Sequence, residues 1–226
     1  FALFWPALFK GAKAHLSYLA IYGFVLALFN ALWTISVTLN GAAVATVLCY
    51  CSAAFTALLG WLILKEELTL AKGIAIVLSL TGCALIVDAF NPEVWNLNLL
   101  GILTGIGSGL FYAIYSLMGR SASAQRGLNP WTTLFYTFLI AAGFMLVFNL
   151  FFGSVLPGGA QKPSDMFWLG NSVMGWVILV LLAIGPTLLG YGLYNVSLTH
   201  LPSSVVNLIV TIEPVFTTIT AYFVLG

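Results

Sequence analysis

Four groups of polar and aromatic residues have the spacing of one helix face and the side-chain types that bind a small polar solute. Residues spaced i, i+3 and i+4 share a face of a helix. The groups are Asn30, Trp33 and Thr34; Tyr191, Tyr194 and Asn195; Thr46 and Tyr50; and Asn207 and Thr211. Amides and hydroxyls form hydrogen bonds, and aromatic rings provide stacking surface. We therefore predict that these residues line a substrate cavity, with hydrogen bonding between neighbouring helices as the alternative.

Two further tyrosines extend this candidate cavity. Tyr112 and Tyr115 follow three glycines, Gly101, Gly105 and Gly109, which form two successive GxxxG steps. Such steps are typical of a close-packed helix seam, not of a chemical site. We expect the tyrosines to contact solute and the glycines to contact another helix.

Glu213 is the one acidic residue near the middle of a long apolar run. An ionisable side chain in that position usually has a function, so Glu213 could couple transport to a proton, or it could instead bond a neighbouring helix. Gly185-Pro186 and Glu213-Pro214 are candidate hinges, because proline removes a helical hydrogen bond. The alternative for both prolines is a kink that only shapes packing.

Composition identifies the elements that must position these residues. The chain has 226 residues, of which 62% are hydrophobic and 6% are charged, with a mean hydropathy of +1.09. Soluble domains have about 25% charged residues, and disordered chains have low hydrophobicity. A net charge of +1 provides no basic face for nucleic acid. An all-α, polytopic membrane protein remains, in contact with the lipid bilayer and without cofactor or metal.

Seven complete membrane spans are predicted, each long enough to cross about 30 Å of hydrocarbon. They cover residues 16–39, 41–64, 71–90, 98–119, 131–153, 173–199 and 202–225. Residues 1–9 read as the end of a further helix, and the last apolar run ends at Gly226 without a flanking anchor. We expect a fragment that is truncated at both ends.

The basic residues are distributed unevenly between the two sides of the membrane. One set of alternate loops carries six of the seven, namely Lys10, Lys13, Lys65, Lys72, Arg120 and Arg126, and the other set carries only Lys162. Positive residues favour the cytoplasmic side. We therefore expect the Lys65–Lys72, Arg120–Arg126 and His200 loops to be cytoplasmic, with the protein in a bacterial inner (plasma) membrane.

An internal repeat relates the two parts of the chain. An offset of 161 residues aligns identical residues such as Leu28 with Leu189 and Phe55 with Phe216. Each helix then matches one five helices further on, in the opposite orientation, as in the inverted repeats of secondary transporters. The complete protein would have roughly 300 residues and ten helices. Residues 1–90 would form a first repeat without its first helix and part of its second, and 98–226 a second repeat without its last helix.

Short motifs resemble a known family. Leu64-Lys65-Glu66-Glu67-Leu68-Thr69, with Gly73 and Gly82 in the next helix, resembles the end of an EamA domain of the drug/metabolite transporter superfamily. Ile212-Glu213-Pro214-Val215-Phe216 is similar to the Leu-Glu-Pro-Val pattern of that family, and Val224-Leu225-Gly226 to its turn. The first half departs from the pattern, because Ala53 aligns with Pro214 and Lys65 replaces the glycine of the turn.

The resemblance implies a ten-helix secondary transporter, not an enzyme, that moves amino acids, metabolites or drugs, often outward. We expect transport of a small neutral or zwitterionic solute by alternating access. A sugar-phosphate or nucleotide-sugar antiporter is one alternative, although phosphate needs Lys or Arg in the cavity. A non-transporting scaffold or lipid-handling protein is another. The sequence leaves the solute, the direction, the coupling ion and the oligomeric state open.

Overall fold

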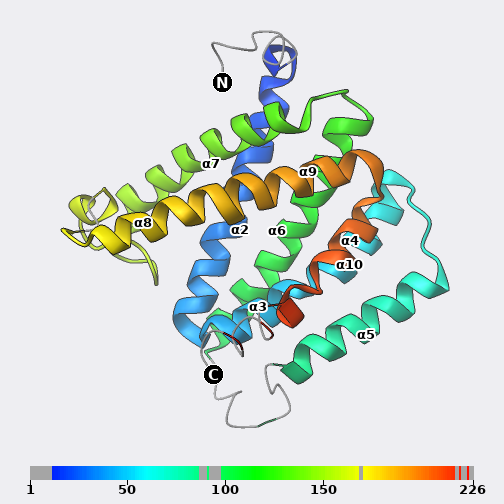
Figure 1. Cartoon of the computed structure of the whole chain (residues 1–226), viewed down its shortest axis with the longest axis horizontal. Coiled ribbons are helices and arrows are strands. Elements are labelled where there is room, and N and C mark those ends of the chain that lie inside the picture. The colour runs from blue at the N-terminus through cyan, green and yellow to red at the C-terminus, as the bar shows by residue number, and fades with distance from the viewer. Residues whose placement is uncertain are drawn as a thin grey trace. The chain divides into compact units, whose positions relative to one another are not determined.

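The computed structural model describes residues 12–86, 91, 98–167, 170–216, 219 and 223. Within these residues every regular element is helical (Figure 1). The elements are η1 (Ala12–His15), α2 (Leu16–Asn40), α3 (Ala42–Tyr50), α4 (Ser52–Leu59), η2 (Gly60–Leu64), α5 (Leu70–Ile86), α6 (Leu99–Ala124), α7 (Pro130–Phe152), η4 (Pro163–Met166), α8 (Val173–Leu182), η5 (Ala183–Gly190), α9 (Tyr191–His200) and α10 (Ser203–Val210). The prediction of an all-α polytopic membrane protein is confirmed.

Five stretches are long and apolar enough to cross a membrane, and two shorter apolar helices accompany them. The long stretches are Leu16–Asn40, Ala42–Leu64, Leu99–Ala124, Pro130–Phe152 and Val173–His200, and the short ones are Leu70–Leu85 and Ser203–Phe216. The five long stretches coincide with predicted spans, and the two short helices overlap the predicted spans 71–90 and 202–225, whose ends lie in part outside the described residues. The partial helix expected over residues 1–9 lies outside the described residues.

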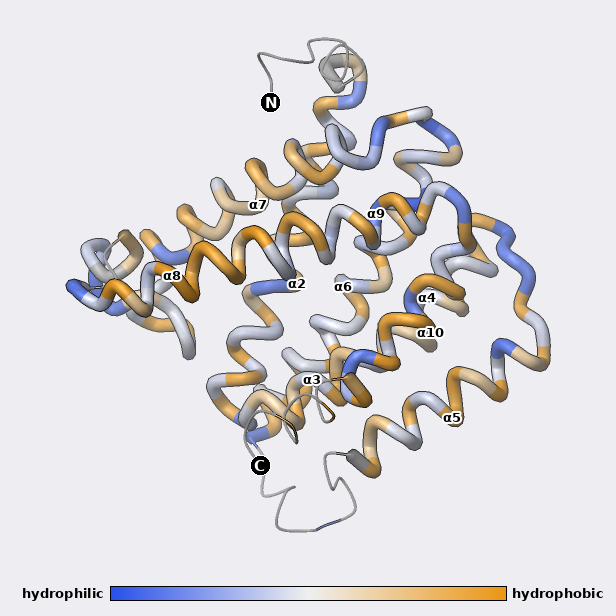
Figure 2. Tube along the Cα trace, viewed as in Figure 1, coloured by the Kyte–Doolittle hydropathy of each residue, from blue (hydrophilic) through white to orange (hydrophobic). Residues whose placement is uncertain are grey.

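Hydropathy follows the helices, and hydrophilic residues gather at the turns, for example between α6 and α7 (Figure 2). The apolar helix α8 has no buried residue. Exposed apolar side chains of this kind are stable against lipid, which is as apolar as they are. The outer surface of these helices is therefore suited to hydrocarbon, not to water.

The chain divides into two compact units. Unit 1 contains residues 1–27 and 118–200, and unit 2 contains residues 28–117 and 201–226. In unit 1, α7 packs against α9, and Leu19, Ala122 and Leu128 form a small buried core. In unit 2, α10 packs against both α4 and α5, and α3 packs against α5.

The glycine seam predicted in α6 is present in unit 2. A Cβ atom on Gly105 would lie 2.7 Å from both Leu48 and Ser36, and one on Gly109 would lie 3.0 Å from the Cys49 carbonyl. Only a residue without a side chain permits this approach of α2 and α3 to α6. The seam brings the helices that carry candidate site residues close together.

Two helices of unit 2 are interrupted at equivalent places. α3 ends at Tyr50 and α4 begins at Ser52, while α10 ends at Val210 and is followed by two turn residues. At both breaks a backbone N–H bonds to the carbonyl three residues earlier, from Cys51 to Leu48 and from Thr211 to Leu208. The first break has Ala53 where the second has Pro214, so a proline is not needed to interrupt the helix.

Candidate functional site

Three contacts show how the α3–α4 stretch and α10 run beside each other in unit 2. A carboxylate that follows η2 bonds to Ser203, Thr56 bonds to Asn207, and Tyr50 bonds to Glu213. Along these contacts the residue numbers of the α3–α4 stretch fall while those of α10 and the residues after it rise. The two interrupted stretches are therefore antiparallel neighbours, and their breaks lie at the same level.

A buried polar group lies at the centre of this pairing. Asn207 is 1% exposed. Its side-chain amide donates to the hydroxyls of Thr56, at 2.8 Å, and Ser116, at 3.2 Å, and its carbonyl oxygen accepts from the Ser52 hydroxyl at 3.1 Å. These four residues, the Asn207 cluster, join α4, α6 and α10 by hydrogen bonds that an apolar environment makes costly to break.

The Tyr50 side chain meets the carboxyl group of Glu213 beside both breaks. The Tyr50 hydroxyl donates to Glu213 Oε2 at 3.4 Å. Tyr50 is 6% exposed, whereas Glu213 is exposed. A carboxyl group that has one buried phenol partner and an open side can bind a cationic group or exchange a proton.

The remaining predicted residues of unit 2 lie on α2, α3 and α6. Asn30, Trp33, Thr34 and Thr46 are half-buried, and the Thr34 hydroxyl donates to the Asn30 carbonyl. On α6 the Tyr112 and Tyr115 rings stack, with centroids 6.2 Å apart and planes 6° apart. Tyr112 also packs on Phe29 of α2, so these tyrosines contribute to packing.

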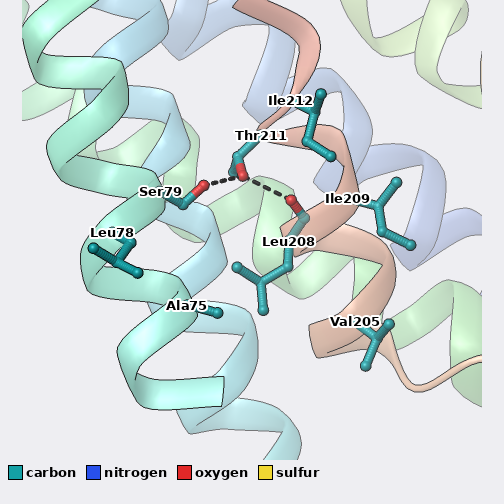
Figure 3. A pocket seen from close by; sticks show the side chains of 8 residues that line it. All are labelled: Ala75, Leu78, Ser79, Val205, Leu208, Ile209, Thr211 and Ile212. Atoms are coloured by element: carbon teal, nitrogen blue, oxygen red, sulfur yellow. Dashed lines mark hydrogen bonds between the residues drawn. The ribbon is translucent and has the colours of Figure 1, made fainter. Parts of the chain in front are cut away.

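An open groove lies between α5 and α10 (Figure 3). It has a volume of about 470 Å³, and Ala75, Leu78, Ser79, Val205, Leu208, Ile209, Thr211 and Ile212 line it. The hydroxyls of Ser79 and Thr211 are hydrogen-bonded to each other, and Thr211 also donates to the Leu208 carbonyl at 2.7 Å. Of the predicted cavity residues, only Thr211 lines this groove.

The other predicted residues belong to unit 1. Tyr194 and Asn195 are buried, and Asn195 accepts a hydrogen bond from the Tyr22 hydroxyl at 3.3 Å. Tyr191 packs edge-on against Phe138 of α7. The structure thus brings Tyr191, Tyr194 and Asn195 together on α9, in a unit separate from the Tyr50 and Glu213 pair.

The candidate hinge at Gly185-Pro186 lies within η5, a π-helical stretch that continues into α9. A π-helix accommodates proline because its hydrogen-bond pattern is already altered. Both residues are consistent with a site of bending, and their role as a hinge stays a prediction.

One cluster was not predicted from the sequence. The Glu66 carboxylate accepts four hydrogen bonds at the start of α10, from the N–H and hydroxyl groups of Ser203 and Ser204, at 2.7 to 3.2 Å. Burial raises the pKa of Glu66, but these four hydrogen bonds outweigh it and hold the pKa below its usual range. The sequence pattern Pro202-Ser203-Ser204 could have indicated a helix start. No local pattern identifies Glu66, 137 residues from Ser203, as its partner.

Two basic side chains of unit 1 have partners. In unit 1 the Arg120 guanidinium donates to the carbonyls of Leu198 and Thr199, both at 2.9 Å, at the end of α9. Arg126 stacks on the Tyr18 ring. Among the described residues, no group of three or more His, Cys, Asp or Glu could hold a metal ion.

Interrupted, antiparallel helices in an all-helical membrane protein are the architecture of secondary transporters. The chain belongs to the EamA-like transporter family, whose profile matches residues 1–88 and 99–226. Members of this family are transporters, which confirms the prediction that the chain is not an enzyme.

Several proteins are similar to this chain. The threonine/homoserine exporter RhtA of Salmonella typhimurium is 28% identical over 134 residues, which cover 58% of this chain and 39% of RhtA. The uncharacterized transporter sll1319 of Synechocystis is 32% identical over 127 residues, or 55% of this chain and 38% of that protein. The uncharacterized transporter YyaM of Bacillus subtilis is 25% identical over 87% of this chain and 61% of its own length.

The chain thus spans about two fifths of the length of RhtA. One solved crystal structure has the same fold, with a TM-score of 0.69 and 18% identity over 93% of this chain and 72% of that chain.

Proposed function

We propose that the protein exports a small neutral or zwitterionic solute of the amino-acid type by alternating access. The observation that carries the proposal is the pair of helix breaks in unit 2, with Tyr50 and Glu213 hydrogen-bonded beside them. Secondary transporters bind solute near the bilayer midplane, at discontinuous helices contributed by both repeats.

The repeat register supports a site at these breaks. With an offset of 161 residues, Cys51 corresponds to Ile212. In the antiparallel pairing of α3–α4 with α10, these two residues also lie at the same level, beside the Tyr50–Glu213 contact. The pseudo-two-fold axis of the proposed repeats, residues 1–90 and 98–226, would therefore pass through the breaks.

The residue types suit an amino-acid-like solute. Glu213 would bind the ammonium group of the solute or carry a coupling proton. The Tyr50 hydroxyl would orient the Glu213 carboxyl group. Within unit 2, Trp33 would offer stacking surface and Asn30 hydrogen bonds. The similarity to RhtA makes L-threonine and L-homoserine the first solutes to test.

Two hydrogen-bonded loop pairs support the proposed sidedness. Asn40, at the end of α2, bonds Asn98, just before α6, and both are predicted to lie outside. Glu66 bonds Ser203, and both loops are predicted to be cytoplasmic. The proposed location is the inner membrane, with the Lys65–Lys72 loop in the cytoplasm.

Transport of radiolabelled L-threonine and L-homoserine by the purified protein in proteoliposomes tests the proposal. We expect uptake that saturates, and at least a tenfold lower rate in Glu213→Gln. The matched control is Glu67→Gln, which makes the same change at an exposed loop position and should leave the rate unchanged. Equal rates in wild type, Glu213→Gln and Asn30→Ala would overturn the proposed site.

A further inference from the structure

One carboxylate accepts four hydrogen bonds at the start of α10. Glu66 Oε1 accepts from the N–H and hydroxyl groups of Ser203, both at 2.7 Å. Oε2 accepts from the N–H of Ser204, at 3.2 Å, and from its hydroxyl, at 2.8 Å. A carboxylate at a helix N-terminus satisfies N–H groups that the helix itself leaves unpaired, and complements the helix dipole. We call Glu66, Ser203 and Ser204 the latch.

The turn after η2 is shaped to present Glu66 to α10. Lys65 has the left-handed conformation, with φ of 55°, and the N–H of Glu66 bonds back to the Gly60 carbonyl at 3.0 Å. A Cβ atom on Gly60 would lie 3.0 Å from Glu66 Oε2 and 3.4 Å from Ser203 Oγ. The backbone of Lys65 thus adopts a costly conformation. Gly60, which has no side chain, leaves the space that the Glu66 carboxylate occupies.

A second charged residue joins the latch to α5. Lys72 Nζ donates to the Glu67 carbonyl, at 2.6 Å, and to the Ser204 hydroxyl, at 3.3 Å. The Ser204 hydroxyl therefore accepts from a cation while it donates to Glu66. This chain of bonds connects the α4–α5 turn, α10 and α5.

The latch and the Asn207 cluster hold the same helix in different surroundings. The Asn207 cluster is buried, and breaking its bonds would leave polar groups without partners. Ser203 and Ser204 are buried as well, but Glu66 is half-buried and its neighbours Lys65 and Glu67 are exposed, so water can reach the latch from the carboxylate side. Ser203 lies nine residues from the level of the breaks, about 14 Å along a helix.

Resting on the proposed function, we infer that the latch is a gate: it closes the end of the solute pathway next to Ser203, and it opens in each transport cycle. The start of α10 then moves away from the α4–α5 turn while the Asn207 cluster stays closed as the pivot. Glu66 is thus a positioning residue that acts on solute through α10.

Two measurements on Glu66→Gln test the gate. Glutamine replaces one acceptor oxygen with an NH₂ group, which cannot accept from a backbone N–H. In hydrogen-exchange mass spectrometry of the protein in lipid nanodiscs, we expect the amides of Ser203 and Ser204 to exchange at least tenfold faster than in wild type. In proteoliposomes we expect the maximal rate of L-threonine transport to change at least fivefold while KM stays within twofold.

The matched control is Glu67→Gln, which should change neither measurement. Should Glu66→Gln fail to fold, the double variant Ser203→Ala, Ser204→Ala removes two of the four bonds and is expected to show both effects at about half the size. Exchange at the wild-type rate would overturn the latch. Faster exchange with unchanged transport would reduce Glu66 to a helix cap and overturn the gate. An absence of L-threonine transport in wild type would contradict the proposed function while the exchange result still tests the latch.

Discussion

The helices α3 and α10 begin at equivalent places in the proposed repeats and begin differently. Ala42 and Ser203 are 161 residues apart, and each is the first residue of its helix. α3 follows Gly41 at φ of 81°, with no side-chain cap, and its first two residues are alanines. α10 starts with two serines whose hydroxyls and N–H groups all bond Glu66. In the proposed repeats, the register would set where a helix begins, and the individual side chains set how firmly that end is held.

The same contrast continues one turn further along. Asn207 of α10 has three hydrogen-bonded partners on α4 and α6 and is buried. Thr46, its counterpart in α3, is half-buried. A transporter with two identical ends would have no preferred resting state. Under the proposed gate, the unequal helix starts would favour a state in which the α10 end is closed.

The largest effect is expected at the Asn207 cluster. Asn207→Ala leaves the hydroxyls of Ser52, Thr56 and Ser116 without their shared partner, at a cost of about 2–4 kcal/mol in the free energy of unfolding. Thr46→Ala, at the equivalent position, is expected to cost less than about 1 kcal/mol. Unfolding with denaturing detergent in mixed micelles measures both, and equal losses would refute the contrast between α3 and α10.

The next effect is a dependence on pH that only the α10 end shows. Because the pKa of Glu66 is lowered in the folded protein, its stabilisation is fully present above the ordinary glutamate pKa of about 4.3 and is lost as the pH falls through the lower, folded value. The difference in unfolding free energy between wild type and Glu66→Gln should therefore shrink below about pH 4.3. The two proteins differ at residue 66 alone, so this difference isolates the contribution of the Glu66 carboxylate. A difference that does not vary with pH would argue against the carboxylate.

The smallest effect is expected at Lys65, whose counterpart in the repeat is Gly226. The left-handed conformation costs a residue other than glycine about 1–2 kcal/mol. Glycine avoids this cost, but it destabilises the folded state by about 0.5–1 kcal/mol because the unfolded chain gains conformational freedom. Lys65→Gly should therefore raise the free energy of unfolding by up to about 1 kcal/mol. Thermal unfolding checks the sign, with Lys162→Gly outside the helices as the control. A clear loss of stability would mean that the Lys65 side chain itself is needed.

The sequence was sufficient for the helices, because apolar runs of span length have few other solutions in a membrane. The break at Thr211 could be expected from the nearby Pro214, but the break at Cys51 could not, since Ala53 stands there. Spacing placed Asn207 and Thr211 on one face, yet only Thr211 lines the groove beside α5. The latch could not be predicted, because helix periodicity relates residues three or four apart, not a glutamate and a serine 137 residues apart.

The length of Val173–His200 connects the protein to the thickness of its host membrane. These 28 residues would extend about 42 Å as a straight helix, against a hydrocarbon core of about 30 Å. A helix that exceeds the core must tilt, bend or stretch the lipids around it. The π-helical η5 with Pro186 lies inside this span and offers a place to bend. Acyl-chain length thereby becomes a physical variable of this protein, and short- and long-chain lipids would select different inclinations of the same helix.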